Sequence, residues 1–477
     1  MLGEVSTMER IERDSLGERA VPAEAYYGIQ TVRAVENYPI SGWRPFPELI
    51  RAIVRIKKCA AQVNAELGLL EESVARAIMV AADEALAGRF DDHFVVDVFN
   101  SGAGVSFHMN VNEVLANRAS EILGGRRGEY ARVHPHDHVN RGQSTNDVMP
   151  TAMRLAALEA ARPLLDGIEG LARAFRGKGE ELRDVVKAGR THLQDAVPVR
   201  LGQEFHAYAR IIEEHGRRIR RAVEELRVLG IGGTAVGTGL NAHPEFRFRL
   251  IEALKRETGE ALIPAEDLMA AMQSMAPFVA FSGAMKNLAL DLVKICDDVR
   301  LMASGPVAGL AEIELPALQP GSSIMPGKVN PVMPEMLTMV CFQVVGNDAT
   351  ITLAAAHGEF ELNVMMPVIA FDLLFSVRIL ANALRVFTER AVVGIRAHVE
   401  RCRYYAESSP ALVTALVPYI GYERAAEVAR ELLATRRTIR EIIRERGWMS
   451  EEDLDRALDI EAMTRGGLLG GEAERSS

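Results

Sequence analysis

The sequence predicts a mainly all-α protein built around a bundle of long helices, and three observations lead to this fold class. Ala, Leu, Glu and Arg, which favour helices, dominate long stretches of the 477-residue chain. Apolar residues recur at steps of three and four, whereas patterns typical of β-strands are few and short. The apolar stretches are hydrophobic on more than one face, as in helices that pack against several neighbours. We therefore expect a helical bundle that forms an oligomer.

Five long helices are predicted from apolar periodicity and helix-favouring composition. Pro163 falls inside the first, so we expect a kink or a break there. Asn347 and Asp348 interrupt the fourth, where we expect a buried polar contact. The predicted helices span residues 153–186, 203–229, 282–301, 334–356 and 367–393.

Segments rich in glycine and polar residues separate these helices and hold the candidate functional residues. They are residues 101–106, 140–147, 189–194, 232–239 and 321–331. Residues 411–460 are predicted as short helices with a break at residues 419–422, followed by a glycine-rich polar tail at residues 465–477. We expect three domains: an N-terminal helical domain (1–143), a central domain of long helices (144–400) and a small C-terminal helical domain (401–477).

Length and composition limit the class of protein. A chain of 477 residues exceeds one small core, so two to four structural units are expected. Hydrophobic residues make up 48% and charged residues 25%, as in an ordinary soluble globular protein. The net charge of −10 argues against a nucleic-acid partner, and any anion site must be built locally.

The N-terminus, the apolar runs and the cysteines indicate a cytoplasmic protein. The charged N-terminus lacks the apolar stretch of a signal peptide. No stretch approaches the ~20 uncharged apolar residues of a membrane span, because the best run, residues 336–356, is broken by Gly346, Asn347 and Asp348. The four cysteines are far apart and form no CxxC pair, so neither a disulfide framework nor a zinc site is expected.

The most informative segment is the loop GSSIMPGKVNP, residues 321–331. Its glycines and prolines exclude the middle of a helix. The hydroxyls of Ser322 and Ser323 stand near the ammonium of Lys328 and the amide of Asn330. Such groups can hold a carboxylate and move a proton beside it. We therefore expect Lys328 to bind a ligand rather than to be an ordinary surface lysine.

Two further polar segments are candidates for binding. Ser144, Thr145 and Asn146 precede a predicted helix, where they either cap it or, with its free N–H groups, receive an anion. His192 follows Thr191 and can act as acid, base or donor near neutral pH, although a lone histidine is as often structural. The run GGTAVGTG lacks the ending of a P-loop, so close backbone packing is expected there instead of nucleotide binding.

Seven motifs together resemble the aspartase/fumarase superfamily, and they cover the chain from about Arg10 to beyond Val368. QSTND, LQDAVP, AYYG and KVNPVMPE look like the aspartase branch, and GGTAVGTGL, NEVLANRASE and GEFELNV look more like class II fumarase. The residues nearest the ligand favour aspartase. In chain order, the motifs are AYYGIQTVRAVENYPIS, MNVNEVLANRASEILG, NRGQSTNDVMPTA, THLQDAVPVRLGQEF, GGTAVGTGLNAHPEF, GSSIMPGKVNPVMPE and GEFELNVMMPV.

The resemblance implies a cofactor-free elimination that turns aspartate into fumarate and ammonia. Ser322 would be the base that removes the Cβ proton, giving an aci-carboxylate that convergent donors stabilise. Backbone N–H groups and Lys328 on a closing loop would stabilise the serine alkoxide. The family pattern assigns the catalytic set to Ser322, His192 and Lys328, and substrate binding to Val105, Ser144, Thr145, Asn146, Thr191, Ser323, Met325, Lys328 and Asn330.

Each part of the substrate has its own contacts in this family pattern. The β-carboxylate would be held by Ser144, Thr145 and Ser323. The α-carboxylate would be held by Thr191, Lys328 and Asn330. Asn146 and His192 would contact the departing amine. The resemblance also implies a three-domain fold, a homotetramer with a core of about 20 helices, and sites shared by three chains. No metal site is implied, and activation by a divalent metal stays open.

The chain departs from the family at a few positions. Val105 stands where the family usually has a threonine, and Phe107 and His108 replace smaller polar residues. His136 stands where relatives often carry asparagine, near a secondary anion site. Losing a hydrogen bond to a charged group costs about 1.5–3 kcal/mol. We therefore expect weaker handling of aspartate, or a preference for a substrate with a less polar substituent.

Three alternatives remain at this point. The first is a class II fumarase, with the same base and with water in place of ammonia. The second is a lyase for a substituted aspartate. The third is a structural protein on the same scaffold, which the retention of Ser322, Lys328 and Asn330 argues against.

Overall fold

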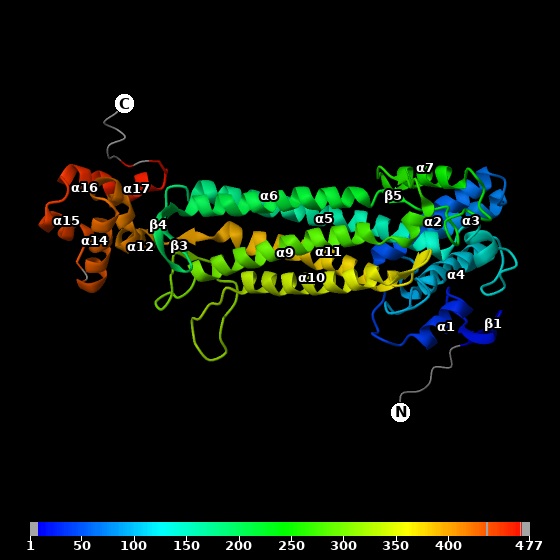
Figure 1. The fold of residues 1–477 in the computed structure, drawn as a ribbon. Coiled ribbons are helices and arrows are strands. Elements are labelled where there is room, and N and C mark those ends of the chain that lie inside the picture. The colour runs from blue at the N-terminus through cyan, green and yellow to red at the C-terminus, as the bar shows by residue number, and fades with distance from the viewer. Residues whose placement is uncertain (1–7, 436, 468, 470–477) are drawn as a thin grey trace. The chain divides into compact units, whose positions relative to one another are not determined.

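The structure is a computed structural model, and it describes residues 8–435, 437–467 and 469 (Figure 1). It is mainly helical, which confirms the predicted fold class. The chain divides into two compact units, which we name unit 1 (residues 1–166, 215–289 and 340–382) and unit 2 (residues 167–214, 290–339 and 383–477). The predicted three-domain boundaries stay a prediction. The first seven residues and most of the predicted glycine-rich tail lie outside the described residues.

All five predicted long helices are present, and each contributes to both units. The predicted break at Pro163 is wrong, because one helix continues through it. Leu164, Ile168 and Leu171 are buried on the C-terminal side of this proline, and their burial offsets the backbone hydrogen bond that proline removes. The long helices are α5 (Thr145–Glu181), α6 (Leu201–Glu225), α9 (Ala276–Met302), α10 (Val332–Ala356) and α11 (Met366–Arg390).

Asn347 and Asp348 form the predicted buried polar contact, but they do not interrupt α10. Asn347 Nδ2 donates to Ser376 Oγ of α11 at 2.9 Å. The Asp348 carboxylate accepts from Ser282 Oγ at 2.8 Å and from Lys286 Nζ at 2.6 Å, both on α9. These bonds satisfy polar groups inside unit 1 and tie three long helices together.

The remaining helices of unit 1 pack around the start of α5. They are α1 (Ile29–Asn37), α2 (Pro47–Glu66), α3 (Glu72–Leu86), η1 (Asp91–His93), α4 (Val105–Ile122), η2 (Pro135–Val139), α7 (Phe246–Thr258) and α8 (Leu268–Gln273). In unit 2, four aromatic rings join α5, α6 and α11, and the centroid of each lies within 6.4 Å of the centroid of a neighbouring ring. They belong to Phe175, Phe205, Tyr208 and Phe387.

The predicted short helices near the C-terminus are confirmed, and they share a small core around Leu416, Ile443 and Leu454. Gly421, with φ +82°, separates two of them at the predicted break. They are α12 (Val399–Ser408), η4 (Pro410–Leu416), α13 (Val417–Ile420), α14 (Tyr422–Thr435), α15 (Ile439–Arg446), α16 (Glu451–Ala457) and α17 (Ile460–Met463), preceded by η3 (Val392–Gly394).

Two antiparallel hairpins were not predicted. The predicted first helix ends at Glu181 rather than 186, and residues 189–194 form a hairpin tip instead of a loop between helices. The hairpins pair β1 (Glu9–Asp14) with β2 (Gly17–Pro22) and β3 (Val186–Thr191) with β4 (Gln194–Arg200). The two-residue strands pair β5 (Val228–Leu229) with β6 (Ile263–Pro264), β7 (Ile313–Glu314) with β10 (Arg396–Ala397), and β8 (Gly358–Glu359) with β9 (Leu362–Asn363).

Two of the motifs that resemble the superfamily, AYYG and NEVLANRASE, contact each other in unit 1. The Glu113 carboxylate of α4 is buried and accepts backbone N–H bonds from Gly28 and Thr31 at 2.9 and 3.1 Å. Burial raises the pKa of Glu113 to about 7, against the effect of these hydrogen bonds. A side chain at Gly28 would meet the Tyr130 hydroxyl at 2.2 Å, so only glycine fits.

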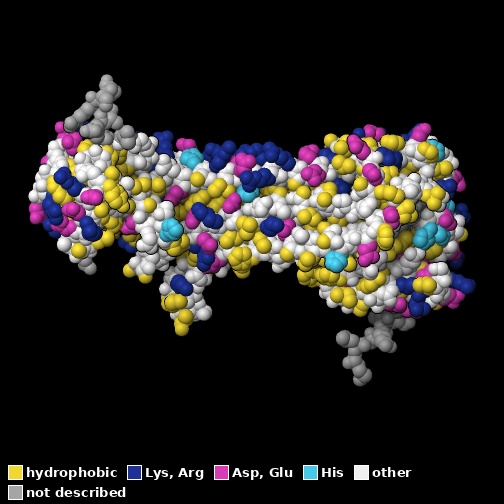
Figure 2. All heavy atoms as spheres, viewed as in Figure 1, with side chains coloured by type: hydrophobic (Ala, Val, Ile, Leu, Met, Phe, Trp, Pro, Cys, Tyr) yellow, Lys and Arg dark blue, Asp and Glu magenta, His cyan; other side chains and the backbone are white. Residues whose placement is uncertain are grey.

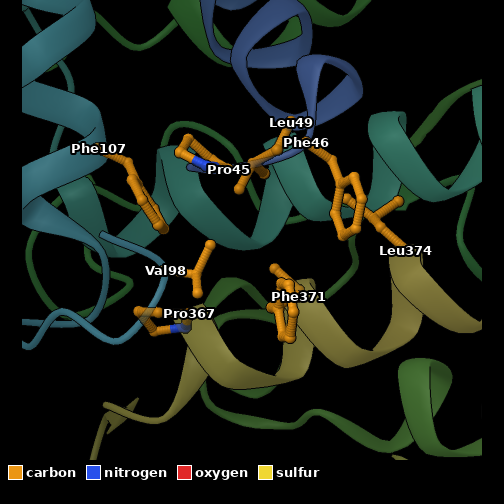
Figure 3. A pocket seen from close by; sticks show the side chains of 9 residues that line it. Pro45, Phe46, Leu49, Val98, Phe107, Pro367, Phe371 and Leu374 are labelled. Carbon is orange, nitrogen blue, oxygen red and sulfur yellow. The ribbon is translucent and has the colours of Figure 1, made fainter. Parts of the chain in front are cut away.

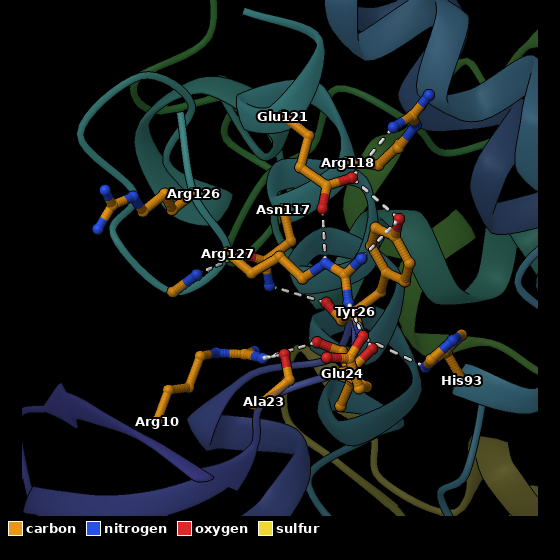
Figure 4. A network of polar contacts seen from close by, with 12 residues as sticks. Arg10, Ala23, Glu24, Tyr26, His93, Asn117, Arg118, Glu121, Arg126 and Arg127 are labelled. Carbon is orange, nitrogen blue, oxygen red and sulfur yellow. Dashed lines mark hydrogen bonds and ion pairs between the residues drawn. The ribbon is translucent and has the colours of Figure 1, made fainter. Parts of the chain in front are cut away.

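A second part of the same contact is a polar network at the end of α4 (Figure 4). The Tyr26 hydroxyl donates to Glu121 Oε2 at 2.9 Å, and Arg127 Nε donates to Glu121 Oε1 at 2.6 Å. The Arg127 guanidinium also lies 4.0 Å above the Tyr26 ring. These residues therefore position the segment that leads into α1.

Helix α10 is apolar on all sides, and only about a third of its most apolar window is buried. Met339, Phe342 and Leu353 are exposed, and hydrophobic side chains gather on the face that Figure 2 shows. By length and composition, Val332–Ala356 and Met366–Gly394 are both apolar enough to cross a membrane. This is weak evidence for a span, since core helices of soluble proteins pass the same test and the second segment is 67% buried.

Candidate active site

Unit 1 contains a cavity of about 410 Å³ that is lined by three of the predicted binding residues, Val105, Ser144 and Thr145. It lies between the start of α4, the residues that lead into α5, and the loop around Thr234. Asn146 is not part of the lining, since its Nδ2 donates to the backbone oxygen of Ala235 at 2.7 Å. Of the four predicted binding residues in unit 1, the structure therefore brings Val105, Ser144 and Thr145 together at one cavity.

Asp147 fixes the start of α5. Its buried carboxylate accepts the N–H of Ser144 at 3.0 Å through one oxygen, and those of Gly232 and Thr234 at 3.0 and 2.9 Å through the other. Burial raises the pKa of Asp147 to about 6, while the three N–H donors act in the opposite direction. Asp147 anchors this helix start, and Ser144 and Thr145 line the cavity. Binding of an anion there stays a prediction.

The predicted packing role of GGTAVGTG is confirmed. Gly232 has φ +92°, and a Cβ there would lie 2.4 Å from the Cβ of Arg247. A Cβ on Gly237, with φ +94°, would lie 2.6 Å from Met269. Because glycine alone tolerates these positions, the loop can approach Asp147 closely with its backbone.

Val105 and His108 change the chemistry of the cavity. Val105 is the first residue of α4, is 39% exposed, and presents no hydroxyl. His108 is buried and places Nδ1 2.8 Å from Thr145 Oγ1. His136 lines the same cavity, with Nε2 2.6 Å from the amide nitrogen of Gln30.

Phe107, the third departure in this segment, points away from these polar residues. It joins Phe46, Val98 and Phe371 around a small apolar pocket elsewhere in unit 1 (Figure 3). Phe107 therefore contributes to packing and does not alter the lining of the 410 Å³ cavity.

The loop 321–331 lies in unit 2 and is not helical, as predicted. Ser322, Met325 and Lys328 line a cavity of about 460 Å³. Ser322 Oγ accepts two backbone N–H bonds, from Ile324 at 3.2 Å and from Met325 at 2.9 Å. Such donors favour an anionic oxygen over a neutral hydroxyl, so this geometry lowers the cost of an alkoxide at Ser322.

The two ends of this loop are tied together. Gly321 N–H donates to the Lys328 backbone oxygen at 2.7 Å, and Asn330 Nδ2 donates to the Gly321 oxygen at 2.7 Å. One hydrogen of the Asn330 amide is therefore used within the loop. The side chains of Ser323 and Lys328 are exposed.

Thr191 and His192 lie at the tip of the β3–β4 hairpin, where both are exposed. His192 and Leu193 have φ values of +53° and +59°, a conformation that costs free energy in residues with a Cβ. Below the tip, the fully buried Glu312 pairs with Arg190 at 2.9 Å and with Lys187 at 3.1 Å. This ion cluster holds the strained tip in place.

Two residues in or behind the lining of the unit 1 cavity were missed by sequence reasoning. Lys57 of α2 is fully buried and reaches His108. Its position four residues after the buried Ile53 was an available signal, since it places Lys57 on the apolar face. Thr234 lines the cavity with a buried hydroxyl that has no hydrogen-bond partner among the described residues. Within that same part of the chain, no group of three or more His, Cys, Asp or Glu could hold a metal ion.

Comparison with known sequences matches this chain to families and proteins of lyases. The family described as Lyase matches residues 17–346, and the family described as Fumarase C C-terminus matches residues 412–465. An aspartate ammonia-lyase of a Bacillus species is 48% identical, with 98% of this chain and 100% of that protein covered. The aspartate ammonia-lyase of Escherichia coli is 46% identical, with 95% of each chain covered.

Solved structures show the same fold. A fumarate lyase:delta crystallin from Brucella melitensis bound to cobalt is 47% identical, with a TM-score of 0.92 over 96% of this chain and 100% of that one. A class II fumarase from Schistosoma mansoni is 37% identical, with a TM-score of 0.93 over 96% of this chain and 99% of that one. The chain therefore belongs to the aspartase/fumarase superfamily of lyases.

Proposed function

We propose that this protein is an aspartate ammonia-lyase, a carbon–nitrogen lyase that reversibly converts L-aspartate into fumarate and ammonia. The observation that carries the proposal is Ser322, whose Oγ accepts two backbone N–H bonds in a loop that also presents Lys328. Sequence identity of 46–48% to aspartate ammonia-lyases over nearly the full length supports this choice over a fumarase.

In the proposed reaction, Ser322 removes the Cβ proton and leaves an aci-carboxylate. The negative charge that develops on this carboxylate is stabilised by Ser144, Thr145 and Ser323. Lys328, with Thr191 and Asn330, holds the α-carboxylate, and Asn330 can donate its second amide hydrogen while the first stays bonded to the Gly321 oxygen. Asn146 and His192 contact the departing amine, and Met325 lines the site. Neutral serine is a weak base, so the two N–H donors to its oxygen are an essential part of this mechanism.

We further propose that the protein is a cytoplasmic homotetramer in which three chains contribute to each site. The exposed apolar side chains of α10 support the assembly, because a monomer would leave Met339, Phe342 and Leu353 in water. The exposure of Thr191, His192 and Lys328 fits residues that a neighbouring chain covers. Size-exclusion chromatography with light scattering checks this, and a fully active monomer would contradict it.

The reaction is proposed to need no cofactor. The related structure from Brucella melitensis is described as bound to cobalt, so activation by a divalent metal is worth a direct test. Full activity after treatment with EDTA is the expected result. A loss of activity that added divalent metal restores would revise the proposal.

The experiment that tests the function follows the ultraviolet absorbance of fumarate with purified protein and L-aspartate. Absorbance should rise with aspartate, and it should fall when fumarate and ammonium are supplied together. Consumption of fumarate without ammonium, with formation of malate, would instead identify a fumarase. No change with either substrate pair would refute both assignments.

A second candidate function is a lyase for an aspartate that carries an apolar substituent. Val105 favours it, because this side chain presents methyl groups to the cavity of unit 1. Aspartates substituted on nitrogen or on Cβ, compared with aspartate at equal concentration, separate the two candidates. A higher kcat/KM for a substituted substrate would support the second one.

A further inference from the structure

A buried ammonium lies behind the lining of the unit 1 cavity. Lys57 Nζ contacts His108 Nε2 at 2.5 Å, Asn140 Oδ1 at 2.8 Å and Gln143 Oε1 at 2.9 Å. The amide nitrogens of Asn140 and Gln143 donate to backbone oxygens at 3.1–3.2 Å, which turns their oxygens toward Lys57. Burial lowers the pKa of Lys57 well below its ordinary value, and the charge of Asp147 acts in the opposite direction. In its charged form Lys57 has three donors and no acceptor, so the three contacts use all of its hydrogens.

This arrangement determines which nitrogen of His108 carries the proton. With Lys57 charged, Nε2 must accept from it, which assigns the proton of the neutral ring to Nδ1. Burial, with the charge of Lys57 beside it, holds the pKa of His108 well below its ordinary value, so the ring stays neutral. Nδ1–H then donates to Thr145 Oγ1 at 2.8 Å.

The Thr145 hydroxyl is left with one direction in which to donate. Its oxygen accepts a hydrogen bond from His108 Nδ1–H, so its own O–H is available to a ligand in the cavity that Thr145 lines. Thr234 lines the same cavity, and its buried hydroxyl has no hydrogen-bond partner among the described residues. A carboxylate accepts hydrogen bonds only, so it matches a lining of donors.

We infer that His108, oriented by Lys57, is a positioning residue that fixes the Thr145 hydroxyl as a donor to a substrate carboxylate. This inference rests on the proposed function for the identity of the ligand. It also gives the lining a fixed donor in a cavity where Val105 supplies none. His108 does not touch the substrate itself, and it acts through Thr145.

Two variants of His108 separate its two contacts. In His108→Asn, the shorter amide lies near the position of Nδ1 and can still donate to Thr145. In His108→Gln, the longer amide reaches Lys57 and leaves Thr145 without its fixed partner. Loss of a donor to a charged group predicts that His108→Gln weakens fumarate binding about tenfold or more, while His108→Asn stays close to wild type.

The control is His215→Gln, which makes the same change at a histidine of unit 1 that is equally buried and does not line the cavity. Its unfolding temperature measures the effect of the substitution on stability alone. Isothermal titration calorimetry with fumarate is measured on all variants, and KM and kcat for aspartate are measured in parallel. We expect His215→Gln to leave the fumarate Kd unchanged.

A double-mutant cycle with Thr145→Val tests whether His108 acts through Thr145. Once the hydroxyl is gone, His108→Gln should weaken fumarate binding no further, so the two losses are not additive. Independent, additive losses would overturn the inference. An unchanged fumarate Kd in His108→Gln would overturn it as well.

Nitrogen NMR of the histidine rings gives a readout on the wild-type protein, so the test does not depend on the folding of a variant. His108 should be protonated at Nδ1, and protonation at Nε2 would overturn the inference. A protein that binds fumarate but does not form it from aspartate would refute the proposed function, while the fumarate Kd values still decide the role of His108. A wild-type protein that does not bind fumarate would refute both.

Discussion

The start of α5 and the loop 321–331 hold candidate residues of one reaction, but they are built in opposite ways. The helix start is held by contacts with distant segments, since Asp147 accepts from the loop around Gly232 and Thr145 contacts His108 of α4. The loop 321–331 is held by hydrogen bonds within itself, and several of its side chains are exposed. A segment with few outside contacts opens at low cost, whereas a buried polar network stays fixed. In the proposed mechanism, the first region therefore fixes the binding geometry and the second moves the base.

The largest expected effect comes from Ser322→Ala, which removes the proposed base from the loop. Turnover should fall to background, at least about 10²–10⁴-fold, because general base catalysis typically contributes that much. Fumarate binding should stay nearly unchanged, since the helix start of unit 1 is intact. Absorbance assays of fumarate measure turnover, and calorimetry measures fumarate binding. Undiminished turnover would show that Ser322 is not the base.

Asp147→Asn tests the fixed region. The amide loses the charge that three backbone N–H groups share, and its NH₂ group faces donors. Hydrogen bonds to a charged group contribute about 1.5–3 kcal/mol each, so the free energy of unfolding should fall by about 3 kcal/mol or more. Urea denaturation measures this loss. Asp137→Asn, at an exposed carboxylate of unit 1, is the matched control and should change stability little.

The buried Glu113 predicts how the stability of unit 1 depends on pH. Its pKa is raised from 4.5 to about 7 in the folded state, so its protonated form is favoured by folding. The contribution is fully present below the unfolded pKa and is lost as pH rises to about 7, by an amount on the order of 3 kcal/mol. Glu113→Gln should flatten the dependence of unfolding free energy on pH over this window. An unaltered pH profile in the variant would contradict the shift.

The smallest expected effect comes from Val105→Thr. The new hydroxyl would face the cavity of unit 1 from the first residue of α4, with little change in side-chain volume. Aspartate turnover should rise, by up to about tenfold in kcat/KM, because a hydrogen bond to a charged group is restored. Val105→Ala controls for the change in shape. If kcat/KM for aspartate rose in both variants, or in neither, then position 105 would not take part in hydrogen bonding to the amine or the carboxylate.

The long helices could be predicted because their signal is local. Apolar residues at steps of three and four mark the face that α5 buries on either side of Pro163, while the effect of the proline and the ends of the helix were misjudged. The β3–β4 hairpin was missed because β3 has no alternation to detect. Residues 186–189 are all buried, including Lys187, whose charge is paired with Glu204 and Glu312 from distant segments.

The residues of the candidate site could also be predicted only where their signal is local. Ser322, Lys328 and Ser144 stand in short polar motifs, so the sequence alone could single them out. Lys57 could not be assigned a role in this way, because its three partners come from two other segments of unit 1, α4 and residues 140–143. A buried charge is recognised only when its neighbours are known, since burial without partners would be prohibitively costly.

The uncovered apolar surface of α10 has a consequence for the behaviour of the protein at low concentration. Helices that lose their covering when chains separate make folding and association one equilibrium, so stability rises with the amount of protein present. Dilution should therefore inactivate the protein with a delay set by how slowly chains part. Mixing with an inactive variant during refolding should produce hybrids, whose activity would count how many chains each catalytic centre requires.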